Sequence, residues 1–173
     1  MRLGLLSDTH IPEAGPRLFP EILEALRGVD AILHAGDLVV PRVLDELEQV
    51  APVFAAQGNH DPELPGDPRL EPLHFLEFEG HSVALLHTFE PLDHGLAGLV
   101  RHFLGGRRTD VIVYGDSHHE RIDWLDGVLL VNPGSATLPR NRSPRLGHIA
   151  FLTLERGRPP HAEIVDLGRP ANP

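Results

Sequence analysis

The feature that most constrains the fold is an alternation of apolar runs and helical patterns over the first sixty residues. Short apolar runs cover residues 2–7, 31–35 and 53–56, and each is followed directly by a polar residue or a glycine. Between them, residues 18–27 and 41–50 repeat apolar side chains at helical spacing. The order strand, helix, strand, helix, strand predicts a right-handed parallel α/β unit.

The rest of the chain has mainly strand patterns. The proline-rich residues 62–72 are predicted to form an exposed loop. Glu79-Gly80 and Asp126-Gly127 each separate two apolar runs and predict hairpin turns. With no break that separates a second unit, residues 1–173 are predicted to form a single domain. The remaining expected elements are a helix at 96–104 and strands at 73–78, 81–87, 111–114, 121–125, 128–131, 149–154 and 162–165.

The sequence has no cysteine and twelve histidines, which narrows the kinds of site it can carry. The lack of cysteine excludes disulfides, thiolate zinc sites and cysteine nucleophiles. A formal net charge of −10 opposes generic nucleic-acid binding, because such a field repels the phosphate backbone. No apolar run approaches the roughly 18 residues of a membrane span, and the first residues turn polar too early for a signal peptide. We expect a soluble, cytoplasmic protein without a membrane partner.

Polar clusters occur where the predicted strands end, and open α/β sheets bind ligands there. A preceding glycine allows a sharp turn, so that the next side chain points across the top of the sheet. Asp8 and His10 are two residues apart, as are Asp116 and His118, so in extended backbone each pair faces one way. The clusters are Asp8-Thr9-His10, Gly36-Asp37, Gly58-Asn59-His60-Asp61, His87, Gly115-Asp116-Ser117-His118 and Asn132-Pro133-Gly134-Ser135.

The side chains in these clusters predict a divalent-metal site. Each cluster alone is a weak indication, and Asp8 alone is equally well explained as part of a helix cap or a loop. Three successive strand ends that carry Asp, His or Asn favour the metal interpretation instead. Carboxylate and amide oxygens together with imidazoles suit Mn, Fe, Zn or Ni better than Ca.

As an ordered series, these clusters resemble the calcineurin-like metallophosphoesterases, most of all their small single-domain phosphodiesterase-like branch. The resemblance spans about residues 3–142. It implies a four-layer α/β/β/α sandwich and two divalent metal ions, with Mn favoured and Fe, Zn or Ni as alternatives. The implied activity is phosphoester hydrolysis, of a diester rather than a monoester, in which a metal-bridging hydroxide attacks phosphorus in line. The implied partner is a small phosphorylated substrate, and a homodimer stays open.

The resemblance also implies the metal ligands. Asp37 is the bridging ligand. Asp116 stands where the family usually has a histidine, and we expect this shorter, charged ligand to favour harder ions such as Mn. His87 is expected to be a metal ligand; the alternative is that it is a structural histidine at the end of a strand. The implied set is Asp8, His10 and His118 for the first metal, Asn59, His87 and Asp116 for the second, and Asp37 for both.

Other residues receive roles outside the ligand set. By resemblance, His60 donates a proton to the leaving oxygen or stabilises the transition state, and Asp61 orients it. His34 is expected to be a buried, hydrogen-bonded support behind the ligands. Arg140 is a candidate phosphate clamp, with a solvated basic loop as the alternative. Surface positions are expected for His74, His81, His94, His102, His148 and His161.

One function of another class fits the same pattern. A retromer subunit resembles this fold, has a stretch like residues 132–137 and serves as a binding scaffold with weak or absent catalysis. It lacks the motif Gly58-Asn59-His60-Asp61, which this chain contains. The motif therefore favours an enzyme over a scaffold, and Asp116 is the feature that favours the scaffold.

Overall fold

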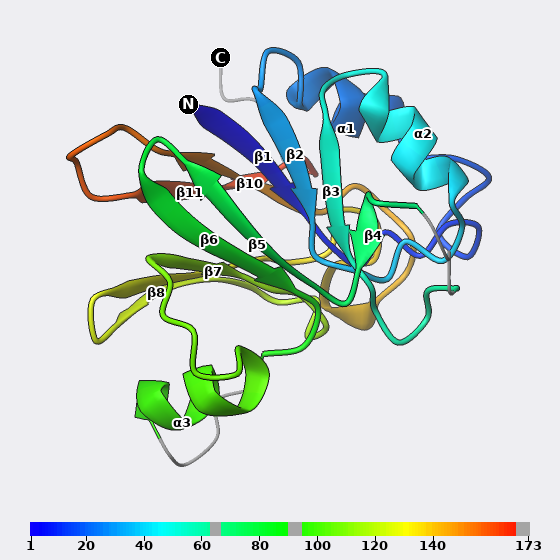
Figure 1. Cartoon of the computed structure of the whole chain (residues 1–173). Helices are drawn as coiled ribbons and strands as arrows, with labels where there is room; N and C mark the ends of the chain where they lie inside the picture. Colours follow the sequence, from blue (N-terminus) through cyan, green and yellow to red (C-terminus); the bar gives the residue numbers. More distant parts are fainter. Residues whose placement is uncertain (63–66, 90–94, 169–173) are drawn as a thin grey trace.

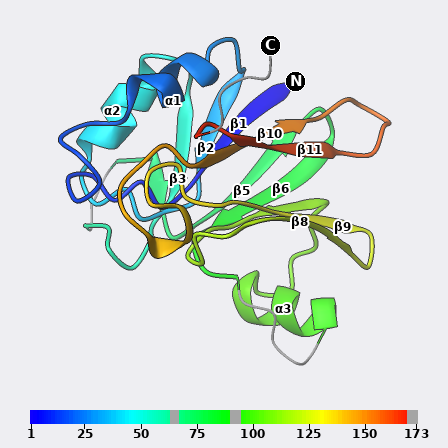
Figure 2. The ribbon, with the colours of Figure 1, turned by 180° about the vertical axis from the view of Figure 1, so that it is seen from behind.

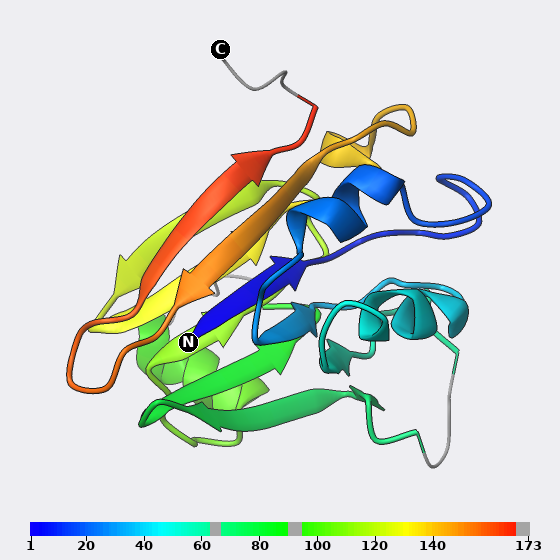
Figure 3. The same ribbon diagram turned by 90° about the horizontal axis from the view of Figure 1, so that it is seen from above.

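The computed structural model describes residues 1–62, 67–89 and 95–168, which are built around two β-sheets (Figure 1). The first sheet has the strand order β11-β10-β1-β2-β3-β4. Strands β1 to β4 run parallel, and β10 and β11 are antiparallel to their neighbours (Figure 3). The bounds are β1 Arg2–Leu6, β2 Ala31–His34, β3 Val53–Ala56, β4 Leu70–Glu71, β10 His148–Thr153 and β11 His161–Asp166.

The second sheet has the order β5-β6-β7-β9-β8. Strands β6, β7 and β9 are parallel, and hairpin partners flank them on both sides. Both predicted hairpins are therefore present. The bounds are β5 Leu73–Phe78, β6 His81–Leu86, β7 Val111–Val113, β8 Glu120–Leu125 and β9 Val128–Pro133.

The helices and the two sheets form four layers, as Figures 1 and 2 show, and three apolar cores lie between these layers. Helices α1 (Pro20–Ala25) and α2 (Arg42–Glu48) cover the outer face of the first sheet. A second core fills the space between the sheets, and helix α3 (Gly95–Phe103) covers part of the outer face of the second sheet. Strands β1 and β2 are buried on both faces, which explains their continuous apolar runs. The predicted α/β/β/α sandwich is confirmed.

The sequence-based boundaries were wrong at several places. Helices α1 and α2 are shorter than the patterns predicted. The expected loop at 62–72 contains strand β4, because Leu70 is buried and pairs with Ala55 of β3; residues 63–66 lie outside the described residues. His74 is not a surface residue, since its ring is buried and lies 2.9 Å from the Ala55 carbonyl oxygen. His94 lies outside the described residues.

The parallel strands of both sheets have their carboxyl ends at one edge of the molecule. Main-chain hydrogen bonds join the loops there: the Asp8 amide donates to Gly36, and the Gly115 amide donates to His87. The polar clusters predicted at strand ends therefore meet at this edge. Within the described residues, no helix is long and apolar enough to cross a membrane.

Candidate metal centre

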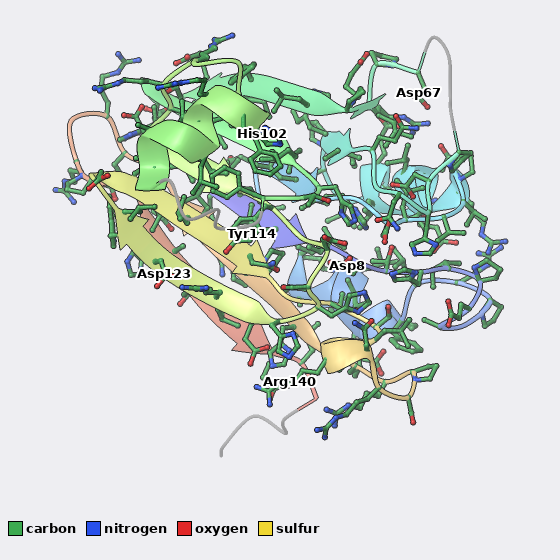
Figure 4. The ribbon with its side chains drawn as sticks, turned by 90° about the horizontal axis from the view of Figure 1, so that it is seen from below. Asp8, Asp67, His102, Tyr114, Asp123 and Arg140 are labelled. Atoms are coloured by element: carbon green, nitrogen blue, oxygen red, sulfur yellow. The ribbon has the colours of Figure 1, made fainter. Side chains whose placement is uncertain are left out.

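Two groups of buried donor side chains lie at the common edge of the two sheets. The first contains Asp8, His10 and His118, and the second contains Asp8, Asp37 and His87. Within each group the donor atoms lie within 4.8 Å of one another. These residues follow β1, β2, β6 and β7, so both sheets contribute (Figure 4 labels Asp8). The fold thus brings together five of the seven residues predicted as metal ligands.

Carboxylate oxygens connect the two groups. Asp37 Oδ2 lies 3.5 Å from Nε2 of His10 and 3.4 Å from Nε2 of His87. Asp8 Oδ1 lies 3.6 Å from Nε2 of His118, and Asp8 belongs to both groups. Oδ2 of Asp37 therefore lies near His10 of the first group and His87 of the second, and Asp8 is a member of both groups; that Asp37 bridges two metal ions stays a prediction.

Main-chain carbonyls set the orientation of two imidazoles. Nδ1 of His87 donates to the Ala35 carbonyl at 2.7 Å, and Nδ1 of His118 donates to the Leu138 carbonyl at 2.8 Å. These hydrogen bonds turn Nδ1 of each ring toward a carbonyl, so the opposite nitrogen, Nε2, faces the carboxylates. An imidazole that donates one ring N–H to the protein and presents the other nitrogen is the usual arrangement of a metal ligand.

Asn59 and Asp116 lie at the outer side of the second group. Oδ1 of Asn59 is 3.1 Å from Nε2 of His87. Oδ1 of Asp116 is 3.6 Å from the same nitrogen, and Oδ2 accepts a hydrogen bond from Thr88 at 3.4 Å. Asp116 is half-exposed and is not a member of either compact group. Its ligation of a metal stays a prediction.

Burial and charge show that the site fits cations. Both carboxylate oxygens of Asp8 and Nε2 of His10 are buried without a hydrogen-bond partner in the described structure. Burial raises the pKa of Asp8 to about 6, although the His118 ring opposes this. Burial lowers the pKa of His87, but its bond to Asp37 and the charges of Asp8 and Asp37 outweigh burial and raise it to about 9. Buried acceptors without donors are what bound metal ions would satisfy.

The predicted ligands have left-handed backbone conformations. For the pairs Asp8/His10 and Asp116/His118, the sequence had predicted extended backbone instead. The φ angles are 53° at Asp8, 42° at His10, 58° at Asp37, 71° at Asp116 and 57° at His118. Non-glycine residues rarely adopt positive φ, and those that do so cluster at functional sites. A different backbone conformation therefore produces the expected grouping of Asp8 with His10, whereas Asp116 does not join the compact group that contains His118.

The glycines before the ligands act in two ways. Gly36 has φ 98°, as a sharp turn requires. Gly58 and Gly115 do not have positive φ, although the predicted turns follow them: the Asp61 amide donates to the Gly58 carbonyl at 3.2 Å, and the Ser117 amide donates to the Gly115 carbonyl at 2.9 Å. A Cβ at Gly58 would lie 2.1 Å from Oδ1 of Asp37, and one at Gly115 would lie 2.0 Å from Oγ of Ser7. Only glycine fits at these two positions, because a larger residue would overlap the neighbouring loop.

Asp61 does not contact His60 as the sequence suggested. Its carboxylate accepts hydrogen bonds from the main-chain amides of Asp37 at 2.9 Å, Gly58 at 2.8 Å and Val39 at 2.7 Å. With both oxygens used this way, Asp61 organises the backbone that carries Asp37. His60 is exposed, and its Nε2 lies 4.0 Å from Oδ2 of Asp37. The predicted proton donor is thus next to the centre, without the predicted orienting carboxylate.

Arg140 does not face the centre as a free cation. Its guanidinium forms an ion pair with Glu120 at 2.8 Å (Figure 4). The phosphate-clamp role stays a prediction, and it requires that this ion pair open.

His34 is the buried support that we expected. Its Nδ1 accepts from the Gly36 amide at 3.2 Å, and its Nε2 donates to Oγ1 of Thr9 at 3.0 Å. Both neighbours belong to loops that carry ligands, so His34 joins the loops after β1 and β2.

Sequence reasoning gave no role to Ser135 and Thr137, whose hydroxyls bind the backbone of the first ligand loop. Oγ of Ser135 donates to the Asp8 carbonyl at 2.7 Å, and Oγ1 of Thr137 donates to the Thr9 carbonyl at 2.7 Å. The motif that contains Ser135 was visible, but nothing in its pattern indicates a partner 127 residues away.

Comparison with known proteins gives consistent matches over most of the chain. A family model described as the calcineurin-like phosphoesterase superfamily domain matches residues 1–157. A probable metallophosphoesterase of Methanothermobacter thermautotrophicus is 36% identical over 171 residues, covering 98% of this chain and 95% of its own length. A phosphodiesterase of Methanocaldococcus jannaschii is 28% identical over 176 residues, covering 95% and 99%.

Solved structures show the same fold at lower identity. Vps29 of Entamoeba histolytica, complexed with zinc, is similar with a TM-score of 0.71 and 20% identity, covering 96% of this chain and 99% of its own. An archaeal phosphodiesterase is similar with a TM-score of 0.68 and 23% identity, covering 95% and 100%.

Proposed function

This chain belongs to the calcineurin-like phosphoesterase superfamily, and from that premise we propose that it hydrolyses phosphodiesters with two divalent metal ions. The observation that carries the proposal is the pair of buried donor groups that share Asp8 and meet at Oδ2 of Asp37. One group alone would support a single ion. Two groups linked by carboxylates support two ions close together, which is typical of metal-dependent phosphoesterases.

The first ion would be held by Asp8, His10, His118 and Asp37, and the second by Asp37, Asn59 and His87, with Asp116 beside it. Bound together, the two ions supply Lewis acidity and a water of lowered pKa. Mn is favoured, with Fe, Zn or Ni as alternatives, because the carboxylate of Asp116 would add a hard oxygen donor to the second group. The protein's part is to hold these donors in place, since the backbones of five of them are hydrogen-bonded to neighbouring loops: Asp8, His10, Asp37, His87 and His118.

His60 is the side chain best placed to move a proton. It is exposed, and its ring centroid lies 5.2 Å from that of His10. A substrate bound at the centre would therefore contact His60 from the solvent side. We propose that His60 protonates the leaving oxygen or stabilises charge on the phosphoryl group.

A groove beside the second donor group favours a diester over a monoester. It has a volume of about 460 Å³ and is lined by Asn59 and His87 together with Leu73, Leu86, Thr88 and Phe103. A diester carries a second organic substituent that needs such a space, whereas a monoester does not. We propose a small phosphorylated substrate, without a membrane or generic nucleic-acid partner; a homodimer stays open.

A binding scaffold with weak catalysis is the alternative. Its support is the likeness of the fold to Vps29. The motif Gly58-Asn59-His60-Asp61 opposes it, because Asn59 lies against His87, and His60 donates its main-chain amide to Oδ1 of Asp37 at 2.9 Å.

Metal analysis together with hydrolysis separates the two functions. We expect about two ions per chain and Mn-dependent hydrolysis of bis(4-nitrophenyl) phosphate in preference to 4-nitrophenyl phosphate. Asp37→Ala and Asn59→Ala should abolish turnover, and His161→Ala, an exposed histidine on β11, should not change it. One ion and no turnover by the unaltered chain would support the scaffold instead. Turnover that persists in both alanine variants would disprove the proposed centre.

A further inference from the structure

The segment of residues 132–140 contacts both loops that carry the first donor group. One loop holds Asp8 and His10 near the start of the chain, and the other holds His118. Asn132 Nδ2 donates to the Gly115 carbonyl at 2.8 Å and to Oγ of Ser117 at 3.1 Å, both just before His118. One short segment thus touches two loops that are more than a hundred residues apart in the chain.

The contacts with the first loop come from two hydroxyls. Oγ of Ser135 donates to the Asp8 carbonyl at 2.7 Å, and Oγ1 of Thr137 donates to the Thr9 carbonyl at 2.7 Å. Both side chains have an exposed fraction of 0%. Their oxygens therefore cannot reach a substrate from solvent, and they act on the backbone on either side of the Asp8 and His10 ligands.

The contacts with the second loop hold His118 at two points. Its ring donates to the Leu138 carbonyl at 2.8 Å, and its own carbonyl accepts from the Arg140 amide at 3.1 Å. Gly134 is packed tightly in the same segment, since a Cβ there would lie 3.0 Å from the Glu120 amide nitrogen. The segment has little freedom to move relative to His118.

The backbone at the ligands needs such support. Asp8, His10 and His118 all have positive φ. Each such residue is unfavourable by about 1–3 kcal/mol and persists only when its surroundings hold it. Ser135 and Thr137 supply buried hydrogen bonds at the Asp8 and Thr9 carbonyls, which are the peptide groups that lead into and out of these conformations.

We propose that Ser135 and Thr137 are positioning residues for the first metal ion: their hydroxyls hold Asp8 and His10 against His118 and raise the affinity of that group for a divalent cation. The inference rests on the proposed two-metal centre. It concerns mainly the first group, because neither hydroxyl bonds to the loops that carry Asp37, Asn59 or His87 in the described structure, and Asp8 is the one member of the second group on the loop that they hold.

The main test variant is Thr137→Val, which removes the hydroxyl and keeps the shape. The matched control is Thr109→Val, because Thr109 is also buried and donates to two carbonyls, those of Ser82 at 2.7 Å and Val111 at 3.0 Å, with no bond to a ligand loop. Thr137→Ser restores the hydroxyl and serves as the rescue.

Each variant is made in two backgrounds. Asn59→Ala with His87→Ala leaves the first group, and His10→Ala with His118→Ala leaves the second. Mn²⁺ is titrated into each metal-free protein, and free Mn²⁺ is followed by electron paramagnetic resonance. Supporting contacts of metal ligands are worth about tenfold to a hundredfold in affinity. We therefore expect Thr137→Val to weaken binding at least about tenfold in the first background and clearly less in the second, where Asp8 is the only donor on the loop that Thr137 holds.

The outcomes separate the alternatives. Thr109→Val should leave both affinities unchanged, and Thr137→Ser should restore the first. An unchanged first affinity in Thr137→Val, or an equal loss in both backgrounds, would overturn the inference. If Thr137→Val does not fold, Ser135→Ala is measured against the same criteria. If the unaltered chain binds no Mn²⁺, the proposed function fails, whereas binding that Thr137→Val does not change defeats only this inference.

Discussion

At the scale of single residues, the centre depends on two kinds of side chain. Some are the candidate metal donors, and others form hydrogen bonds with the main chain of the loops that carry these donors. Asp61 and His34 both lie behind the donors, and both bond to the loops after β1, β2 or β3. Asp8 is buried, and neither of its carboxylate oxygens has a hydrogen-bond partner within the described residues, so the hydrogen bonds of its backbone help to position it. The supporting residues should therefore affect stability and metal affinity together.

Replacement of Asp61 by asparagine tests the backbone role of this carboxylate. An asparagine side chain has one acceptor oxygen in place of two. Its NH₂ group would therefore face at least one of the main-chain amides that now donate to Asp61, and that amide would lose its acceptor. Hydrogen bonds to charged groups are worth about 1.5–3 kcal/mol each, so we expect Asp61→Asn to lose about 2–4 kcal/mol of unfolding free energy and to bind Mn²⁺ more weakly. Urea unfolding and metal titration measure both.

The control for this variant is Asp30→Asn, because exposed Asp30 accepts one main-chain bond, from Arg2 at 2.6 Å, far from the centre. We expect it to lose at most about 1 kcal/mol. An Asp61→Asn protein with unchanged stability and a shifted pH profile of hydrolysis would show that Asp61 acts on His60 after all.

His34 makes stability depend on pH. Burial, followed by the charge of His87, lowers the pKa of His34 from 6.5 to about 3. Between these values the unfolded chain binds a proton that the folded chain does not, so stability is present above pH 6.5 and falls as the pH falls. The slope is about 1.4 kcal/mol per pH unit.

Urea unfolding near pH 7.5 and pH 5.5 measures this contribution. We expect the unaltered chain to lose about 1.4 kcal/mol more than His34→Asn between these conditions. Asparagine is a suitable partner variant because its amide oxygen can accept the Gly36 bond without titrating. Equal losses in the two proteins would mean that His34 is not held neutral by the fold.

At the scale of elements, the ligands lie on loops whose ends are fixed by parallel strands. β1, β2 and β3 are neighbours in one sheet, so the loops after them are adjacent and close enough for direct main-chain bonds. Little space remains between these loops. Gly58, after β3, is in contact with Asp37, after β2.

Gly58→Ala should therefore disrupt the centre through packing alone. Its Cβ would lie 2.1 Å from Oδ1 and 2.4 Å from the amide nitrogen of Asp37, so one loop must move. We expect loss of Mn²⁺ binding and about 1–3 kcal/mol of stability. Metal content and urea unfolding measure these effects.

Gly127→Ala is the comparison for Gly58→Ala. Gly127 has φ 82° in the β8–β9 turn, and a Cβ there would meet no atom within 4 Å. It should lose about 1 kcal/mol from backbone strain and keep its metal. Normal metal content in Gly58→Ala would show that the loops can separate without harm.

At the scale of the whole molecule, the carboxyl ends of the parallel strands of both sheets lie at one edge, and buried acidic groups gather there. The chain has a formal net charge of −10, and Asp8 and Asp37 are buried within the site. The fold therefore places negative charge where cations are needed to offset it. That residues 1–173 behave as a single domain stays a prediction.

Metal removal should destabilise the entire fold, because the ligands come from both sheets. A ligand at a hundred times its Kd adds about 2.7 kcal/mol. For a chain of this size, that corresponds to a rise in Tm of about 5–10 °C. Thermal melts in Mn²⁺ and in chelator measure the difference.

The matched protein for this measurement is Asp37→Ala, which lacks the carboxylate that lies within 3.5 Å of both His10 and His87. Its Tm should respond much less to Mn²⁺. A shift as large as that of the unaltered chain would place the stabilising ion somewhere else.

The sequence by itself determined the strand order of the α/β unit, both hairpins and the residues that gather at the strand ends. These features are local, since apolar periodicity and turn residues act over a few positions. Even so, the burial of His74 and the short strand at Leu70 escaped prediction, because each depends on a contact with Ala55 in another strand.

Only the tertiary structure decided how the polar clusters at the strand ends are held. The left-handed backbone at Asp8, the partners of Asp61 and the hydroxyl of Thr137 are set by contacts between loops distant in the chain. Such contacts exist only after the sheets have packed, so no local pattern encodes them. The sequence predicted which side chains gather at the candidate metal centre, and the packing of the two sheets determined the hydrogen bonds that orient them.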